Sequence, residues 1–225
     1  MNKQQLLLLC AVALIFLFSN CAATRIVKPL DKKQWAAGFD FGGAIIDFAG
    51  IKIPLPLTSF TAAYGVDSQL TVFGSLHTTA LAAGVVQMEF GAVRSLFKTD
   101  KNGFNFSGGL IANAMVSTWD GKARFYPEAD LNAYYTYGAK KRNYAYVSVA
   151  NWFDLQVTQA HNVPNKEHWI PNIALGHTFC TRKMKYTLET RWIAPLSSNQ
   201  NLVVGYNGIA NQGSLGVYFS VFRTF

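Results

Sequence analysis

The sequence predicts an all-β fold, a single antiparallel up-and-down barrel of about ten strands (8–12) that spans a membrane. Three observations support this prediction. Polar and apolar residues alternate along about ten segments, the connections between segments alternate in length, and aromatic residues gather near the segment ends. After the first twenty residues, no apolar run approaches the length of roughly 18 residues that a membrane-spanning helix needs, so a membrane protein of this composition must span as strands.

Each segment has the two-residue period of a half-buried β-strand. In the fifth segment, Phe104, Phe106 and Leu110 share one face, while Asn105 and Ser107 share the other. The predicted segments are 34–44, 57–65, 69–80, 85–97, 103–117, 126–138, 143–154, 169–180, 184–195 and 213–225. They make residues 34–225 one barrel, and an even number of strands places both ends of that barrel on the same side of the membrane.

Alternation alone leaves two barrels of opposite sidedness open. A membrane barrel turns its apolar face outward to lipid, whereas a soluble barrel turns it inward. In the first case Phe39, Phe41, Leu110 and Leu131 face outward and Glu128, Asp130 and Glu189 face inward, and in the second case these directions are reversed.

The connection lengths favour the membrane barrel. Tight links follow every second segment, at 66–68, 98–102, 139–142 and 181–183. Three of the other links are long, at 45–56, 155–168 and 196–212. Short periplasmic turns that alternate with longer external loops are typical of outer-membrane barrels.

Aromatic residues are expected to form two girdles at the membrane–water interfaces. Trp152, Trp169 and Trp192 fall at the ends that lead into long loops. The ends beside the short turns carry Trp35, Tyr64, Phe97, Phe104, Tyr137, Tyr144, Phe179, Tyr186 and Phe225.

Residues 1–20 have the pattern of a secretory signal peptide, with Lys3 before an uncharged apolar run from Leu6 to Phe18. The sequence that ends in Cys21, Phe-Ser-Asn-Cys, resembles a lipobox, although Asn20 stands where Gly or Ala is usual. This resemblance implies that Cys21 is acylated and that residues 21–33 form a lipidated N-terminal tether. The alternative is an ordinary signal peptide cut near Ala22 and Ala23, which would leave Cys21 free to pair with Cys180.

The end of the chain resembles the C-terminal signature by which the barrel-insertion machinery recognises outer-membrane barrels. Phe219, Val221 and Phe225 carry this resemblance, and Arg223 interrupts the apolar face. With the alternation and the girdles, residues 34–225 resemble the small outer-membrane β-barrel proteins of Gram-negative bacteria. The resemblance implies an outer-membrane location, outer-membrane lipids as neighbours, and both termini in the periplasm.

The predicted inward face carries seven charged residues that we expect to form a lumen charge network: Asp40, Glu89, Glu128, Asp130, Lys185, Glu189 and Arg191. Burial of a charge is costly without a partner, so we expect Arg191 and Lys185 to pair with some of the acids. Barrels of about eight strands are filled by their own side chains, which argues against a general diffusion porin.

Three functions remain open. The leading one is a barrel lipoprotein with a structural, adhesive or narrow-pore role. The second is a soluble periplasmic lipocalin-like lipoprotein that binds an apolar ligand. The third is an outer-membrane lipid-modifying enzyme, which would need a histidine beside a hydroxyl and a carboxylate. Of the histidines 77, 161, 168 and 177, His77 shares the inward face with Ser75, but no His-x-Ser or Asp-x-His spacing occurs. We therefore predict no catalytic residues, no metal site and no cofactor.

Basic residues gather at the predicted periplasmic turns and make the chain from Cys21 onward cationic, with about 19 basic and 12 acidic residues. Their place in turns, and export from the cytoplasm, argue against a nucleic-acid partner.

Overall fold

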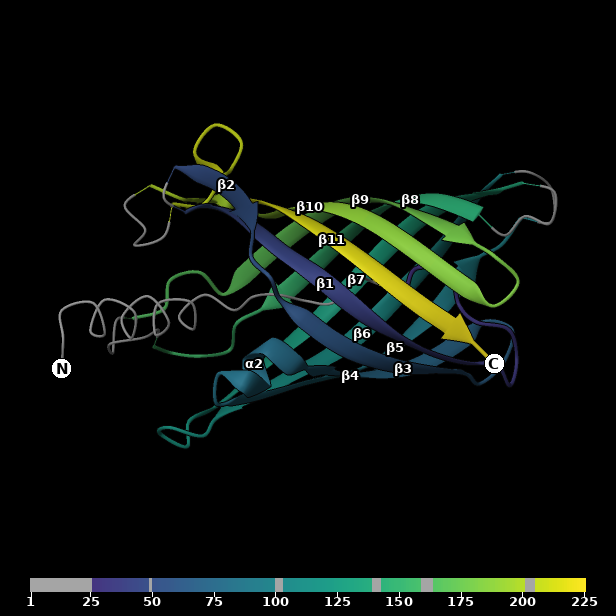
Figure 1. The fold of residues 1–225 in the computed structure, drawn as a ribbon, viewed down its shortest axis with the longest axis horizontal. Helices are drawn as coiled ribbons and strands as arrows, with labels where there is room; N and C mark the ends of the chain where they lie inside the picture. Colours follow the sequence, from purple (N-terminus) through teal and green to yellow (C-terminus); the bar gives the residue numbers. More distant parts are fainter. Residues whose placement is uncertain (1–25, 49, 100–102, 139–142, 159–163, 201–204) are drawn as a thin grey trace.

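Ten antiparallel strands form a closed barrel in the computed structural model, which describes residues 26–48, 50–99, 103–138, 143–158, 164–200 and 205–225 (Figure 1). Hydrogen-bonded pairing between the first and last strands, from Ala36 with Thr224 to Ala44 with Gly216, closes the ring. The ring strands are β1 (Trp35–Phe48), β3 (Thr58–Gly65), β4 (Leu70–His77), β5 (Val85–Phe97), β6 (Phe104–Ser117), β7 (Ala123–Tyr137), β8 (Asn143–Phe153), β9 (Trp169–Cys180), β10 (Met184–Ser198) and β11 (Gln212–Thr224). The predicted fold class and strand number are confirmed.

The two ends of the barrel differ in their connections. At one end, which we call the short-turn end, compact turns join β3 to β4 and β9 to β10, and both ends of the barrel chain meet there, with the Phe225 amide donating to the Trp35 carbonyl at 2.9 Å. Local side chains form these turns, since Asp67 Oδ1 accepts the Leu70 amide at 2.8 Å and Thr181 Oγ1 accepts the Met184 amide at 3.0 Å. The long-loop end carries the extended connections.

Two predicted regions have a different secondary structure, both at the long-loop end. Residues 45–56 were expected to be a loop, but β1 continues to Phe48 and pairs with β2 (Ile51–Pro54), because Ile46 and Ile53 continue the pairing. Residues 78–80 were expected to extend a strand, but they begin α2 (Thr78–Ala82). Alanine favours a helical turn there, and Gly84 with φ +78° follows the helix.

No helix among the described residues is long and apolar enough to cross a membrane.

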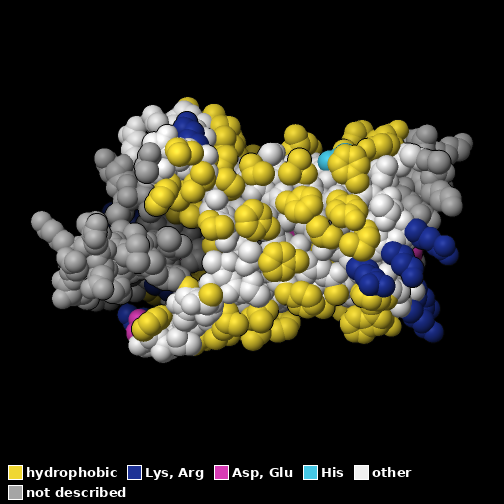
Figure 2. All heavy atoms as spheres, viewed as in Figure 1, with side chains coloured by type: hydrophobic (Ala, Val, Ile, Leu, Met, Phe, Trp, Pro, Cys, Tyr) yellow, Lys and Arg dark blue, Asp and Glu magenta, His cyan; other side chains and the backbone are white. Residues whose placement is uncertain are grey.

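The outer wall of the barrel is apolar and the inner wall is polar. Leu110 is 72% exposed and Leu131 is 61% exposed, whereas the alternating neighbours Asn113 and Asp130 are buried. Figure 2 shows apolar side chains covering the middle of the barrel, with basic side chains at the short-turn end. This sidedness is the one predicted for a membrane barrel, and it contradicts the inward-facing apolar core of the lipocalin-like alternative.

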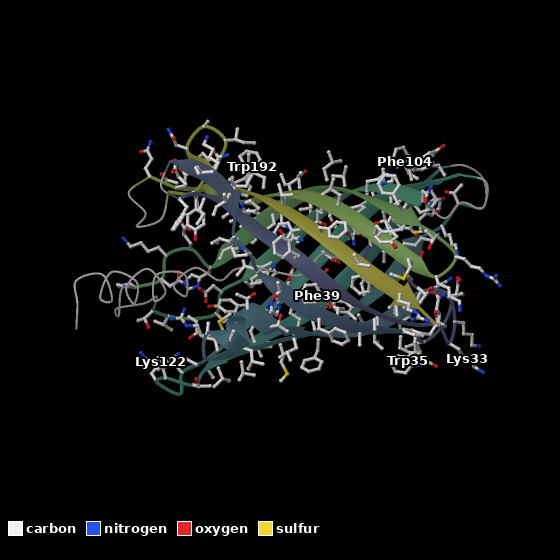
Figure 3. The ribbon with its side chains drawn as sticks, viewed as in Figure 1. Lys33, Trp35, Phe39, Phe104, Lys122 and Trp192 are labelled. Carbon is white, nitrogen blue, oxygen red and sulfur yellow. The ribbon has the colours of Figure 1, made fainter. Side chains whose placement is uncertain are left out.

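Most of the predicted girdle aromatics lie on the outer wall. At the short-turn end Trp35 and Phe104 are more than half exposed, and Trp35 packs on Tyr64 with ring centres 4.8 Å apart (Figure 3). Trp169 and Trp192 lie at the long-loop end, where the Trp192 indole donates to the Gln212 carbonyl at 3.1 Å.

The prediction is wrong for Tyr144 and Trp152, which point into the barrel and are 5% and 2% exposed. Both share the alternation parity of the inward-facing Ser148, and the small and aliphatic residues Ala145 and Val147 occupy the outer face of β8 instead.

In the last strand, Phe219 and Phe225 are exposed on the outer face, and Val221 shares their parity. The Arg223 guanidinium lies 5.1 Å from the centre of the Phe225 ring, a cation–π contact at the edge of the apolar face.

Candidate functional site: the barrel lumen

The inward faces of neighbouring strands bring six of the seven predicted network residues into the interior of the barrel. Asp40, Glu89, Glu128, Asp130, Glu189 and Arg191 are each at most 4% exposed. Lys185 has the inward parity of β10, but it is less buried and pairs in register with Cys180, near the short-turn end.

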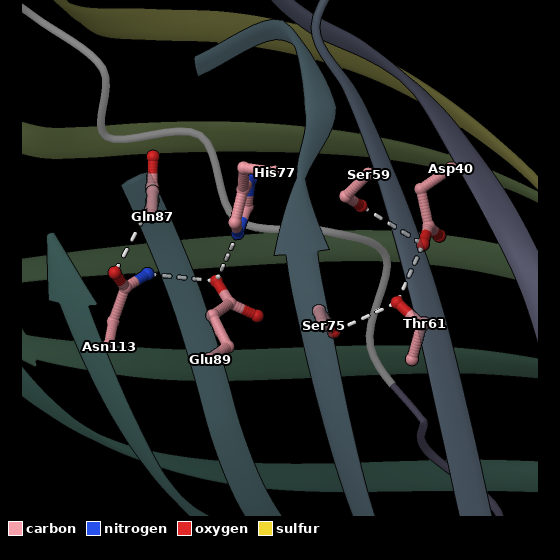
Figure 4. Close-up of polar contacts among 8 residues, drawn as sticks. All are labelled: Asp40, Ser59, Thr61, Ser75, His77, Gln87, Glu89 and Asn113. Carbon is pink, nitrogen blue, oxygen red and sulfur yellow. Dashed lines mark hydrogen bonds and ion pairs between the residues drawn. The ribbon is translucent and has the colours of Figure 1, made fainter. Parts of the chain in front are cut away.

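Asp40 on β1 lies at the centre of a hydroxyl cluster (Figure 4). Ser59 and Thr61 on the next ring strand donate to Asp40 Oδ2 at 3.2 and 3.1 Å. Thr61 Oγ1 is also 2.8 Å from Ser75 Oγ on β4. These bonds follow from register, because antiparallel pairing places Asp40 opposite Ser59 and Thr61 opposite Ser75.

A second chain of contacts runs across β4, β5 and β6 (Figure 4). His77 Nε2 lies 3.2 Å from Glu89 Oε1, and Asn113 Nδ2 donates to the same oxygen at 2.9 Å. Gln87 Nε2 donates to Asn113 Oδ1 at 3.3 Å. All four side chains are buried, so the Glu89 carboxylate accepts a hydrogen bond from Asn113 on β6 and lies within ion-pair distance of His77 on β4.

The third group surrounds Arg191 on β10. Its Nε donates to Glu189 Oε1 at 3.1 Å, and its Nη2 contacts the same oxygen. Tyr146 on β8 donates its hydroxyl to Glu189 Oε2 at 2.7 Å, and the Arg191 guanidinium lies 4.6 Å from the centre of the Tyr218 ring. The expected pairing of Arg191 with a lumen acid is therefore present.

Among the described residues, Lys185 forms no ion pair with a lumen acid, and its neighbour on β9 in the strand register is Cys180. The reason is depth, since Lys185 lies six residues nearer the start of β10 than Arg191 does. Among the described residues, five buried carboxylates (Asp40, Glu89, Glu128, Asp130 and Glu189) therefore face a single buried arginine, while the partly buried amines of Lys28 and Lys185 lie nearer the short-turn end.

Residues 26–33, which we call the leading segment, enter the barrel at the short-turn end, with Val27 and Leu30 buried inside it and residues 31–33 exposed at its rim. Val27 is fully buried against Tyr134, Tyr144 and Tyr146, and its carbonyl accepts a hydrogen bond from Ser107 Oγ at 2.5 Å. Leu30 packs against Ala36, Ala63 and Phe222, and its amide donates to Thr71 Oγ1 at 2.8 Å. These residues belong to the stretch 21–33 for which the sequence predicts a tether.

The leading segment crosses the lumen from one wall to the other. The tyrosines around Val27 belong to β7 and β8, whereas the residues around Leu30 belong to β1, β3 and β11, on the opposite side of the ring. A glycine permits this path, because a Cβ at Gly65 would collide with the Asp31 carbonyl. The lumen thus holds a chain segment in addition to its wall side chains. The sequence signal for it was the pair of apolar residues Val27 and Leu30 before the barrel, facing three inward tyrosines.

The histidines do not assemble a catalytic triad. His77 lies beside Glu89 and opposite Ser59 in the strand register, but the Ser59 hydroxyl donates to Asp40. His177 contacts Tyr137, and His168 Nδ1 lies 2.8 Å from the Asp154 carbonyl. His161 is outside the described residues. In the described ranges, no three His, Cys, Asp or Glu side chains could together hold a metal ion.

No protein-family model matches the sequence, and no curated protein matches it. Among chains of known structure, 51 are similar. The NanC porin is 11% identical, with 83% of this chain and 98% of that chain covered and a TM-score of 0.45. An outer membrane channel from Pseudomonas putida F1 is 9% identical, with 91% and 100% covered and a TM-score of 0.49. OprG, an outer membrane protein from Pseudomonas aeruginosa, is 10% identical, with 88% and 98% covered and a TM-score of 0.34. Matches this distant assign neither a family nor a function.

Proposed function

We propose that this chain is a β-barrel of the Gram-negative outer membrane whose lumen forms a narrow, cation-preferring passage. The leading segment closes this passage at the short-turn end, which faces the periplasm. The observation that carries the proposal is the combination of an apolar outer wall with an inner wall on which five buried carboxylates oppose one arginine. Acidic linings favour cations over anions in membrane pores, since they lower the electrostatic cost of cation entry.

The position of the leading segment supports a closed resting state. Its backbone is hydrogen-bonded to wall residues of β4 and β6, and its apolar side chains pack on both sides of the lumen. A lumen blocked by a peptide segment can be opened by displacing that segment, whereas a lumen blocked by wall side chains opens only if the wall itself changes.

Planar-bilayer conductance tests this function. We expect low conductance for the mature chain, and higher conductance for a variant in which Val27 and Leu30 are both replaced by Ser. In a KCl gradient the open variant should give a reversal potential of the sign that K⁺ selectivity produces. Glu89→Gln with Asp130→Asn in that background should move this potential toward zero. An open variant without conductance, or with anion selectivity, would refute the passage.

We further propose that residues 1–20 are removed and that Cys21 carries the lipid anchor. The Phe-Ser-Asn-Cys sequence supports this proposal. Metabolic labelling with a fatty-acid analogue should mark the wild type and leave Cys21→Ser unmarked. Equal labelling of both would remove the anchor from the proposal and return the Cys21–Cys180 pair as the alternative. Mass measurement of the mature N-terminus would separate these cases.

Adhesion is the second candidate role, and a separate observation favours it. Trp119 and Val157 at the long-loop end are 82% and 81% exposed, and both lie outside the strands. Apolar side chains left in water on loops lower the free energy when they are buried against another apolar surface. If Trp119→Ser with Val157→Ser lowers attachment of whole cells to apolar surfaces and leaves conductance unchanged, adhesion is supported.

We also propose that Phe219, Val221 and Phe225 are read by the barrel-insertion machinery. Their exposure on one face of the last strand supports this role. Phe225→Ala should lower the amount of folded barrel in cells while leaving refolding of the purified chain into vesicles unchanged.

A further inference from the structure

The two ends of the barrel differ in charge. Exposed residues of the turns and the leading segment at the short-turn end include two acids, Asp31 and Asp67, and five bases: Lys32, Lys33, Lys98, Arg182 and Lys183. At the long-loop end the described connections and the β1–β2 hairpin carry three bases (Lys52, Lys122 and Lys166) against four acids (Asp47, Asp120, Asp154 and Glu167). Only the short-turn end therefore has a surplus of positive charge among the described residues, as Figure 2 also shows on the face in view.

The lipid-facing wall repeats this asymmetry. Arg94 on β5 points outward and is exposed, whereas its chain neighbours Val93 and Ser95 point inward. Its partners in the strand register, Leu70 and Gly108, also belong to the outer face. Arg223 lies on the outer face over the Phe225 ring. Within the described barrel strands, these two arginines are the charged side chains on the apolar wall, and both lie near the short-turn end.

The depth of these charges points to lipid headgroups. Lys33 lies two residues from Trp35 and Lys98 follows Phe97, so the cations lie beside the aromatic girdle that marks the membrane–water interface (Figure 3). Arginines a few residues inside the apolar wall can extend to the same level, because their long stems stay in the apolar layer while the guanidinium reaches the interface. Charges at this level meet phosphate groups of the bilayer.

We propose that these seven cationic residues, the cationic rim, bind anionic phospholipid headgroups of the leaflet on the short-turn side. The rim consists of Lys32, Lys33, Arg94, Lys98, Arg182, Lys183 and Arg223. Basic residues near an anionic lipid surface are attracted to it, and this attraction falls off within a Debye length. The rim thereby orients and stabilises the barrel in an asymmetric membrane. This inference rests on the membrane insertion proposed above.

Spin-labelled lipids test the inference directly. The mature chain is folded into vesicles with equal amounts of phosphatidylcholine and phosphatidylglycerol, and a trace of either lipid carries the label. We expect the protein to immobilise phosphatidylglycerol about threefold more than phosphatidylcholine at low salt. This preference should disappear in high salt, which screens interactions between exposed charges.

Two variants and one control locate the effect. Replacing the five turn residues Lys32, Lys33, Lys98, Arg182 and Lys183 by Gln should reduce the preference to less than half. The double variant Arg94→Gln with Arg223→Gln should also reduce the preference for phosphatidylglycerol. This second variant keeps the test decisive if the variant with five substitutions fails to fold. The matched control replaces Lys52, Lys122 and Lys166 at the long-loop end by Gln and should keep the full preference.

The outcomes separate the two proposals. Failure of the wild type to insert into any vesicle would overturn the membrane proposal itself. Insertion with equal immobilisation of the two lipids, or equal loss of preference in the control, would overturn the rim alone. Rim-dependent binding to isolated peptidoglycan without a lipid preference would also overturn it, since the partner would then be an anionic polymer.

Discussion

The ion pair between Glu189 and Arg191 lies inside the barrel, where both side chains are almost completely removed from water. The pair is stabilised by its surroundings, because Tyr146 donates to the other carboxylate oxygen and Tyr218 lies against the guanidinium. Loss of one partner would leave a buried charge that no longer has its main counter-charge, which is more costly than losing both.

Arg191→Met and Glu189→Gln should therefore each lower the free energy of unfolding by about 3 kcal/mol, as is typical when one partner of a buried pair is removed. The double variant should lose clearly less than the sum of the two. Urea unfolding in detergent micelles, followed by tryptophan fluorescence and by the shift of the folded band in gels, measures all three. Additive losses would show that the two residues act independently.

At Gly42, the addition of a single Cβ atom is expected to lower the stability of the barrel. This glycine has φ +134°, and a Cβ there would collide with the Val217 carbonyl across the seam between β1 and β11. Both the backbone angle and the close approach require glycine.

We expect Gly42→Ala to lower the free energy of unfolding by about 2 kcal/mol or more, because residues held in such backbone conformations carry strain of about 1–3 kcal/mol. Gly74→Ala is the matched control. A Cβ at Gly74 would meet the Phe90 ring at 3.4 Å and the Glu89 carbonyl at 3.7 Å, which are ordinary van der Waals distances. Equal stability of the two variants in urea would contradict the role assigned to the seam.

At the scale of elements, the leading segment is the part of the molecule whose role changes most with its surroundings. It forms no helix or strand, and inside the barrel it is held by wall hydrogen bonds and by two apolar clusters. The turn after β3 also fixes it, since the Lys33 amide donates to the Gly65 carbonyl at 2.7 Å and the Gly65 amide donates to the Gln34 carbonyl at 2.9 Å.

Gly65→Ala should displace the leading segment, because the added methyl group would collide with the Asp31 carbonyl. The expected result is a higher single-channel conductance in planar bilayers with the barrel still folded. Gly74→Ala again serves as the control and should conduct as the wild type does. If both variants stay closed, the leading segment is not what limits the passage.

At the scale of the whole molecule, the barrel presents an apolar surface on its outside and a polar surface on its inside. The strands supply an apolar outer wall and a polar inner wall from the same alternating residues, and the pairing of β1 with β11 leaves no unpaired edge in the ten-strand ring. The charge asymmetry between the two ends is likewise a property of the assembled ring, since its residues come from turns far apart in the chain.

Labelling of single cysteines in a Cys180→Ser background tests this sidedness. Cysteines at Leu110, Leu131 and Leu188, which are exposed on the outer wall, should react with a bilayer-confined reagent and not with a water-soluble one. Cysteines at the inward positions Asn113, Asn132 and Thr187 should never react with the bilayer-confined reagent. Reaction of the leucine positions with the water-soluble reagent alone would refute membrane insertion.

The sequence by itself determined the strand order and most of the girdle positions, because a two-residue period is local and can be read along each strand. The sidedness needed a second signal, the alternating connection lengths and the aromatic strand ends, because alternation alone fits an apolar face on either side of the wall. Only the tertiary structure decided which inward-facing side chains contact one another inside the ring. Whether Asp40 contacts Thr61, or Glu89 contacts His77, depends on the register between strands, and the position of Lys185 depends on depth along the barrel. The leading segment could not be predicted as a plug, since its binding site combines residues of β1, β3, β4, β6, β7, β8 and β11 and exists only after the ring has closed.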